Sequence, residues 1–125
     1  MRLEFLADGA DECPLLRLYD WQTGQVALLR EAAEQLATGA SRSVVLNSLP
    51  FIEVVGSITF TWVADPWDRG VLLPHDRRSF VMQLPPETWS DVVEIIRPFE
   101  RDAIGFNWLL PVTEVEVLLS LSGQW

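Results

Sequence analysis

The stretch SITFTWVA, residues 57–64, is the strongest strand signal in this sequence. Apolar residues alternate along it with hydroxylated ones: Ile58, Phe60 and Trp62 against Ser57, Thr59 and Thr61. Successive side chains of a strand point to opposite faces, so one face of this segment should meet a core. β-Branched and aromatic residues also suit the pleated backbone. The pattern therefore predicts a central or near-central strand whose apolar face is buried.

Weaker alternation or β-prone composition predicts further strands along the chain: 2–7, 14–20, 79–85 and 114–121, with shorter ones within 41–55, 71–74 and 105–110. The first two are close enough to pair as a hairpin, with 8–13 as the turn between them. We expect 114–121 to be an edge strand, with Glu114 and Glu116 turned away from the core.

Two segments show the spacing of amphipathic helices, with apolar residues recurring every three or four positions. The first covers 24–38, and Gly39 suits the left-handed residue that commonly ends a helix. The second begins at Pro86 and ends before Pro98. The residues expected to be buried are Val26, Leu29, Ala33 and Leu36 in the first helix and Trp89, Val92, Val93 and Ile96 in the second.

The order of these elements indicates an α+β fold. Short separations between strands favour hairpins, and regular strand–helix–strand crossovers are not evident. We therefore expect a mainly antiparallel sheet of about five to six strands, with two α-helices packed on one face. The length of 125 residues suits a single globular domain covering 1–125.

The charge pattern limits the classes of partner. Eighteen acidic residues face nine basic ones, all of them Arg, which gives a net charge of −9. Because nucleic acids and anionic lipids are bound through basic surfaces, we expect neither as a partner. An acidic surface instead favours a basic protein partner. The absence of Lys excludes Schiff-base and phosphate-loop lysine chemistry.

Cysteine content and hydrophobic patterning bear on the compartment. One cysteine, Cys13, cannot form an internal disulfide, and the neighbouring acids disfavour its reactive thiolate. No apolar run is long enough for a membrane span, and the first residues do not fit a signal peptide. We therefore expect a cytoplasmic protein without a membrane partner. No motif for a bound cofactor or metal is present, so none is expected.

Polar residues in two loops are weak candidates for a polar site: Asp65, Asp68, His75 and Asp76. His75 with Asp76 is an imidazole–carboxylate pair, but no nucleophile motif accompanies it. If the two loops met, the carboxylates and His75 could ligate a cation, although their spacing matches no known loop. Acidic turn residues more often only shape the turn, and no residue is assigned a catalytic role.

Tryptophan is abundant, with six copies, and two of them are candidates for contacts with another protein. Trp67 lies in a predicted turn beside Arg69, and Trp with Arg is a frequent combination at interface hot spots. Trp125 ends the sequence next to the expected edge strand. A two-fold dimer would bury Trp125 and protect that edge, whereas in a monomer Trp125 would fold back on its own sheet.

Two functions from different classes follow from these features. The first is a non-enzymatic protein-interaction domain, such as an acidic inhibitor, an immunity-like protein or an adaptor. The alternative is a small enzyme or ligand-binding protein that uses carboxylates and His75 in a pocket between sheet and helices. A concave pocket converging on acids with raised pKa would favour the alternative. A flat acidic or aromatic patch would favour the interaction domain.

Overall fold

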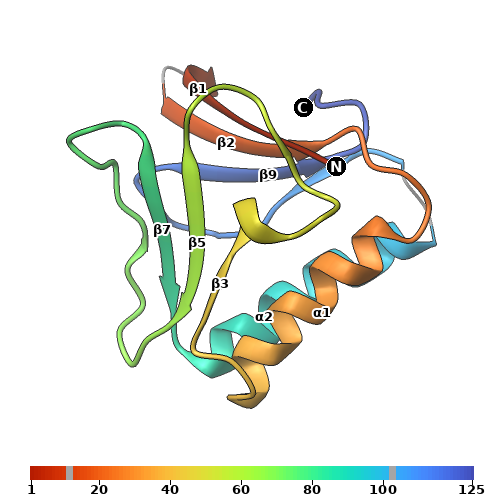
Figure 1. Ribbon diagram of the computed structural model, residues 1–125, viewed down its shortest axis with the longest axis vertical. Coiled ribbons are helices and arrows are strands. Elements are labelled where there is room, and N and C mark those ends of the chain that lie inside the picture. Colours follow the sequence, from red (N-terminus) through yellow and green to blue (C-terminus); the bar gives the residue numbers. More distant parts are fainter. Residues whose placement is uncertain (11–12, 102–103) are drawn as a thin grey trace.

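The computed structural model describes residues 1–10, 13–101 and 104–125. Within them the strands form two sheets that run across each other (Figure 1). The five-stranded sheet has the order β4 (Glu53–Val54), β1 (Arg2–Ala10), β2 (Cys13–Tyr19), β9 (Glu116–Ser120) and β8 (Phe106–Trp108). The four-stranded sheet has the order β3 (Ser43–Val45), β5 (Thr59–Ala64), β7 (Ser79–Leu84) and β6 (Gly70–Val71).

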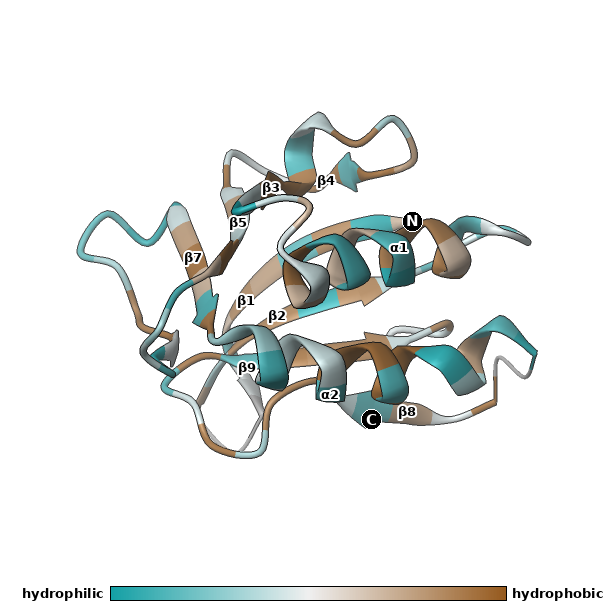
Figure 2. Ribbon diagram, turned by 90° about the horizontal axis from the view of Figure 1, so that it is seen from below, coloured by the Kyte–Doolittle hydropathy of each residue, from teal (hydrophilic) through white to brown (hydrophobic). Residues whose placement is uncertain are grey.

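Two helices accompany the sheets, α1 (Gln25–Thr38) and α2 (Pro86–Ile96). They lie side by side, as Figure 2 shows from below. Short 3₁₀ turns follow β3 and α2: η1 (Leu46–Ser48) and η2 (Arg97–Glu100). Most buried apolar side chains of both sheets and both helices belong to one core cluster, whereas Leu15 and Leu118 are buried outside it. The α+β class expected from the sequence is therefore confirmed.

The prediction of one mainly antiparallel sheet is wrong. The chain forms two mixed sheets, because β1 pairs with β4, β2 with β9 and β5 with β7 in parallel. The helices are also not clearly packed on one face of a single sheet. Parallel neighbours need long connections. The chain between β1 and β4 and between β2 and β9 includes α1, whereas residues 65–78, which contain β6, connect β5 to β7.

Strand β5 has the predicted register. Phe60 and Trp62 are fully buried, whereas Thr59 is exposed and Thr61 is half-buried. Ile58 lies just before the strand and is half-buried. The strand lies between β3 and β7, so it is central in its sheet, as the alternation indicated.

An aromatic cluster joins β5 to α2. The rings of Trp62 and Trp89 have centroids 5.1 Å apart, and Phe60 packs edge-on against Trp62 at 6.3 Å. Trp89 donates a 3.0 Å hydrogen bond from Nε1 to the carbonyl of Val63. The Nε1 of Trp62 is buried without a hydrogen-bond partner among the described residues. Two neighbouring indoles thus have opposite hydrogen-bonding states.

Both helices bury the predicted faces. Val26, Leu29, Ala33 and Leu36 of α1 and Trp89, Val92, Val93 and Ile96 of α2 are all buried. Gly39 ends α1 in the left-handed conformation, with φ of 83°. Arg30 of α1 donates to Glu100 of η2 at 3.0 Å and to Glu34 at 2.6 Å, which ties the end of α2 to α1.

The prediction that 114–121 is an edge strand is wrong. Strand β9 lies between β2 and β8, and its residues 117–120 are buried on both faces. Leu118 and Ser120 face away from the predicted core side, yet their exposed fraction is zero. The N-terminal hairpin is confirmed, but β1 continues to Ala10, and residues 11–12 of the predicted turn lie outside the described residues.

A candidate binding groove beside the second helix

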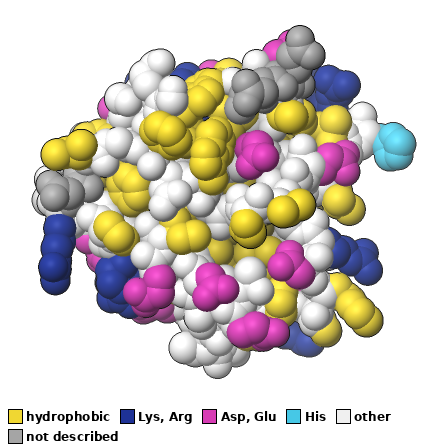
Figure 3. All heavy atoms as spheres, turned by 180° about the vertical axis from the view of Figure 1, so that it is seen from behind, with side chains coloured by type: hydrophobic (Ala, Val, Ile, Leu, Met, Phe, Trp, Pro, Cys, Tyr) yellow, Lys and Arg dark blue, Asp and Glu magenta, His cyan; other side chains and the backbone are white. Residues whose placement is uncertain are grey.

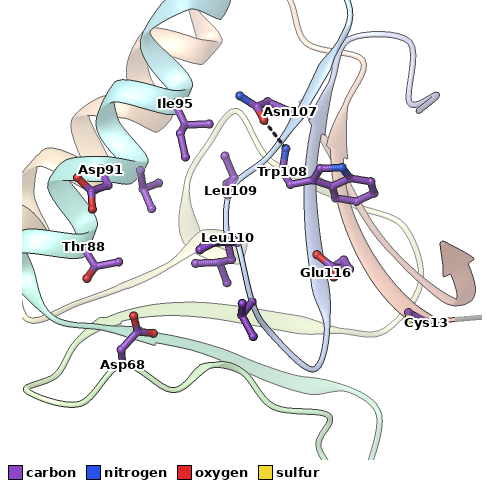
Figure 4. A pocket seen from close by; sticks show the side chains of 13 residues that line it. Cys13, Asp68, Thr88, Asp91, Ile95, Asn107, Trp108, Leu109, Leu110 and Glu116 are labelled. Carbon is purple, nitrogen blue, oxygen red and sulfur yellow. Dashed lines mark hydrogen bonds between the residues drawn. The ribbon is translucent and has the colours of Figure 1, made fainter. Parts of the chain in front are cut away.

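A groove of about 1110 Å³ runs between α2 and the chain from β8 to β9 (Figure 4). Its lining combines an apolar floor with carboxylates: Cys13, Asp68, Thr88, Asp91, Val92, Ile95, Asn107, Trp108, Leu109, Leu110, Pro111, Val112 and Glu116. Pockets for small molecules typically have roughly 300–1,000 Å³. The groove is therefore about as large as the upper end of this range.

One wall of the groove is a single stripe of α2. Thr88, Asp91, Val92 and Ile95 follow one another at intervals of three, one and three residues, which places them on one helix face over two turns. Trp89 and Ile96 point instead into the core, where both are fully buried. Val92 is buried, but Ile95 is only half-buried, so α2 presents an apolar side chain to the groove beside Thr88 and Asp91.

The opposite wall comes from β8 and the segment that follows it. Trp108 packs edge-on against Phe106, with ring centroids 5.9 Å apart. Leu109 and Leu110 are buried and form part of the floor. Val112 stands at the rim with 85% of its surface exposed. The backbone N–H of Trp108 donates to Oδ1 of Asn107 at 2.9 Å, the bond drawn in Figure 4.

Three carboxylates line the groove: Asp68 from the loop after β5, Asp91 from α2 and Glu116 from β9. Within the described residues none of them is in an ion pair. Some acids elsewhere are paired with Arg, such as Glu4 with Arg17 and Glu34 with Arg30. The lining contains no Arg. The groove thus collects uncompensated negative charge above an apolar floor.

Figure 3 shows the face that is turned away in Figure 1, on the side of α2. Apolar and acidic side chains mix over its middle, while the basic side chains lie toward its rim. This distribution agrees with the residues that line the groove. A positively charged apolar ligand would therefore meet attraction and little repulsion on this face.

Burial raises the pKa of Glu116. Removing a carboxylate from water disfavours its charged form, and in the described part of the chain no Arg forms an ion pair with Glu116. A raised pKa in the folded state means that the neutral form contributes stability at low pH. This contribution is lost as the pH rises through the folded-state pKa. At neutral pH the ionised Glu116 therefore works against the fold.

We expect Glu116→Gln to raise the free energy of unfolding at pH 7, because the neutral amide avoids the burial of a charge. The gain should vanish at a pH below the ordinary range of Glu, where the native side chain is itself protonated. Urea unfolding at both pH values measures the difference. Glu31→Gln, an exposed position on α1, is the control and should change little at either pH. A destabilised Glu116→Gln protein at pH 7 would contradict this prediction.

The end of the groove near Val112 is held to β6 by Thr113. The backbone N–H of Val71 donates to Oγ1 of Thr113 at 2.9 Å, and that hydroxyl donates to the carbonyl of Val71 at 3.1 Å. The N–H of Val115 donates to the same carbonyl at 3.0 Å. Gly70 lies against Thr113, and a Cβ atom on Gly70 would stand 2.8 Å from Oγ1. Close approach therefore fixes the segment that carries Val112.

The four polar candidates from the sequence do not form one site. Asp65 accepts the N–H of Trp67 at 2.9 Å and so shapes its own turn. Hydrogen bonds from the backbone and hydroxyl of Ser79, and from the backbone of Arg78, lower the pKa of Asp76 to about 2. His75 is exposed in its loop, and it does not line the groove.

Of these four residues, Asp68 alone reaches the groove. Among the described residues there is no group of three or more His, Cys, Asp or Glu side chains that could hold a metal ion. The cation site considered from the sequence, formed by the meeting of the two loops, is therefore not found there.

The candidates for protein contacts are exposed. Trp67 has 68% of its surface accessible and immediately precedes Asp68 of the groove, and Arg69 follows. Trp125 is 45% exposed. Its role at a dimer interface stays a prediction, but β9 is not the edge that such a dimer would protect.

Sequence reasoning missed Thr88, Asp91, Trp108 and Glu116 as members of one site. A signal was present in α2, where Ile95 is apolar but lies outside the predicted core stripe. Glu116 faces away from Val117, as predicted, but the face of β9 that carries Glu116 borders the groove instead of open solvent. β9 and α2 line the same groove because of tertiary packing, which the spacing of residues along the chain does not indicate.

No helix of the described residues has the length and apolar character to cross a membrane. Comparison with protein-family models, with curated proteins and with solved structures gives no match for this chain.

Proposed function

We propose that this chain is a protein-interaction domain that binds a basic segment of a partner protein in the groove beside α2. The observation that carries the proposal is the charge of the lining: three acids without a pairing Arg, above an apolar floor. A ligand with Arg or Lys next to apolar side chains complements both properties. The groove thus offers a place where a basic partner, which the acidic composition favours, could bind.

The surroundings of the three acids favour a macromolecular ligand. Asp68, Asp91 and Glu116 come from three separate elements, and they are not among any metal-holding group in the described part of the chain. Exposed apolar side chains extend the surface beyond the groove, with Val112 on its rim and Trp67 next to Asp68. Apolar and aromatic side chains at a groove rim supply the area that protein contacts need.

One observation favours the alternative of a small ligand-binding protein or enzyme. A pocket with acids is present, and the pKa of Glu116 is raised, which suits a residue that exchanges a proton. In that function Glu116 acts with Asp91 on a small organic cation, without His75. The exposed apolar side chains of Val112 at the rim and Trp67 next to Asp68 support the protein ligand instead.

Selection of random peptides displayed on phage tests the proposal. We expect peptides selected on the wild-type protein to combine Arg or Lys with Leu, Ile or Phe. Their affinities, measured by calorimetry, should fall at least tenfold on Asp91→Arg, since reversing a charge in the groove is worth about 1.4 kcal/mol or more. Higher salt should weaken the same complexes.

Glu31→Arg is the matched control, because it makes the same change of net charge at an exposed position on α1, outside the groove. It should leave the affinity nearly unchanged. The proposal fails if no peptide is enriched, if enriched peptides are acidic or neutral, or if both variants weaken binding equally. Binding of small organic cations with no enriched peptide would support the alternative.

A further inference from the structure

We infer that the ligand segment binds as an amphipathic helix, which lies beside α2 with its apolar stripe on the groove floor and its basic side chains toward Asp91 and Glu116. This inference rests on the function proposed above and specifies the form of the ligand. It follows from the shape of the groove wall, the state of the β8 edge and the placement of the acids.

The groove wall formed by α2 is suited to helix packing. The stripe from Thr88 to Ile95 covers two turns, a length of roughly 10 Å along the axis. Ridges of side chains at intervals of three and four residues fit the grooves of a second helix with the same intervals. Helix α1 already packs against another flank of α2, and among the described residues α1 contributes nothing to the groove lining. A bound helix would cover the flank that is left.

A ligand in an extended conformation would form few backbone hydrogen bonds at this groove. Peptides that add a strand to a sheet obtain affinity from backbone hydrogen bonds along the edge. Strand β8 has three residues, so such a ladder would be short. One of its donors is already in use, because the N–H of Trp108 is bonded to Oδ1 of Asn107. The side chains of the groove, and not its backbone, must therefore provide the contacts.

The acids lie where a basic helix would place its cations. Asp91 stands on α2 next to Val92, and Glu116 lies across the groove on β9 (Figure 4). The apolar residues Val92, Ile95, Leu109 and Leu110 lie in the floor and walls between these elements. A helix with one apolar stripe flanked by Arg on both sides would place its apolar side chains against the floor and a positive charge near each of the two acids.

Two synthetic peptides of identical composition test the inference on the intact chain. Both contain Leu, Arg, Ala and Gln over about three helical turns. In one peptide Leu recurs at helical spacing with Arg beside it, and in the other Leu and Arg alternate as in a strand. We expect the helical peptide to bind at least tenfold more tightly by fluorescence anisotropy. Its amide resonances should show helix formation in the complex, and the perturbed protein resonances should include Ile95 and Leu109.

Asn107→Ala distinguishes the two modes from the side of the protein. The change frees the N–H of Trp108, so a ligand that adds as a strand would gain a donor and bind more tightly. A helical ligand gains nothing from this donor, so its affinity should not rise. Tighter or equal binding of the alternating peptide, or a gain on Asn107→Ala, overturns the helical form and leaves the proposed function standing. If neither peptide binds and display selection also yields none, the proposed function itself fails.

Discussion

Trp89→Ala is expected to lower the free energy of unfolding by about 3–5 kcal/mol, the usual range for removing a large aromatic side chain from a core. Trp89 is fully buried, lies against Trp62 and attaches α2 to β5 through its bond to Val63. Its loss would leave a cavity and free the helix that forms one groove wall. Urea unfolding monitored by circular dichroism measures the change.

Phe replacements at the two packed indoles separate hydrogen bonding from packing. Trp89→Phe loses a hydrogen bond, whereas Trp62→Phe removes a buried donor that has no partner among the described residues. A buried hydrogen bond contributes about 1 kcal/mol, and a buried donor without a partner costs about 1–3 kcal/mol. Trp89→Phe should therefore be the more destabilising of the two. Equal losses, or a larger loss for Trp62→Phe, would contradict the different hydrogen-bonding states of these indoles.

Gly70→Ala is expected to be the second severe change, with a loss of about 2–4 kcal/mol from a left-handed backbone and a broken hydrogen bond. Gly70 has φ of 57°, and the added Cβ would stand 2.8 Å from Oγ1 of Thr113. Moving that hydroxyl breaks its two bonds to Val71. Because the same hydroxyl positions the segment with Val112, peptide affinity should fall together with stability.

Gly39→Ala is the matched control for this change. Gly39 also has a positive φ, of 83°, but nothing lies within 4 Å of a Cβ added there. Its substitution should therefore cost about 1–2 kcal/mol, from the backbone alone. It should also leave peptide affinity unchanged, since Gly39 lies outside the groove. If the two variants are equally stable, contact with Thr113 does not hold the groove end.

The sequence predicts those parts of this fold that are decided locally. The helical period located α1 and α2 with their buried faces, and alternation set the register of β5, because both patterns reflect which side of an element meets the core. Strand pairing is not decided locally, because the sequence of β9 does not indicate whether this strand pairs with β2 or with β1. The run from Val117 to Leu119 is apolar without interruption, which is typical of a strand buried on both faces and was a signal for a central position.

The groove could be predicted less well than the fold. The three groove acids are among eighteen acidic residues in the sequence. For most of these residues the sequence does not indicate which side chains lie next to them in the fold. Asp68 was identified by its turn and proved to line the groove, whereas Asp65 and Asp76 hold turns together. What distinguishes the groove acids is that three separate elements place them along one apolar groove, which is a property of packing between those elements.

The central position of β9 also has a consequence for how the chain reaches its native state. Residues 15–18 of β2 pair in parallel with 116–119 of β9, a contact between positions roughly a hundred residues apart, and contacts of such long range slow folding. On the ribosome the N-terminal hairpin emerges early and must wait with one side of β2 unpaired until β9 has been synthesised. During this interval β2 can pair with other chains, so this protein should depend more on chaperones during synthesis than a protein of equal size with local contacts.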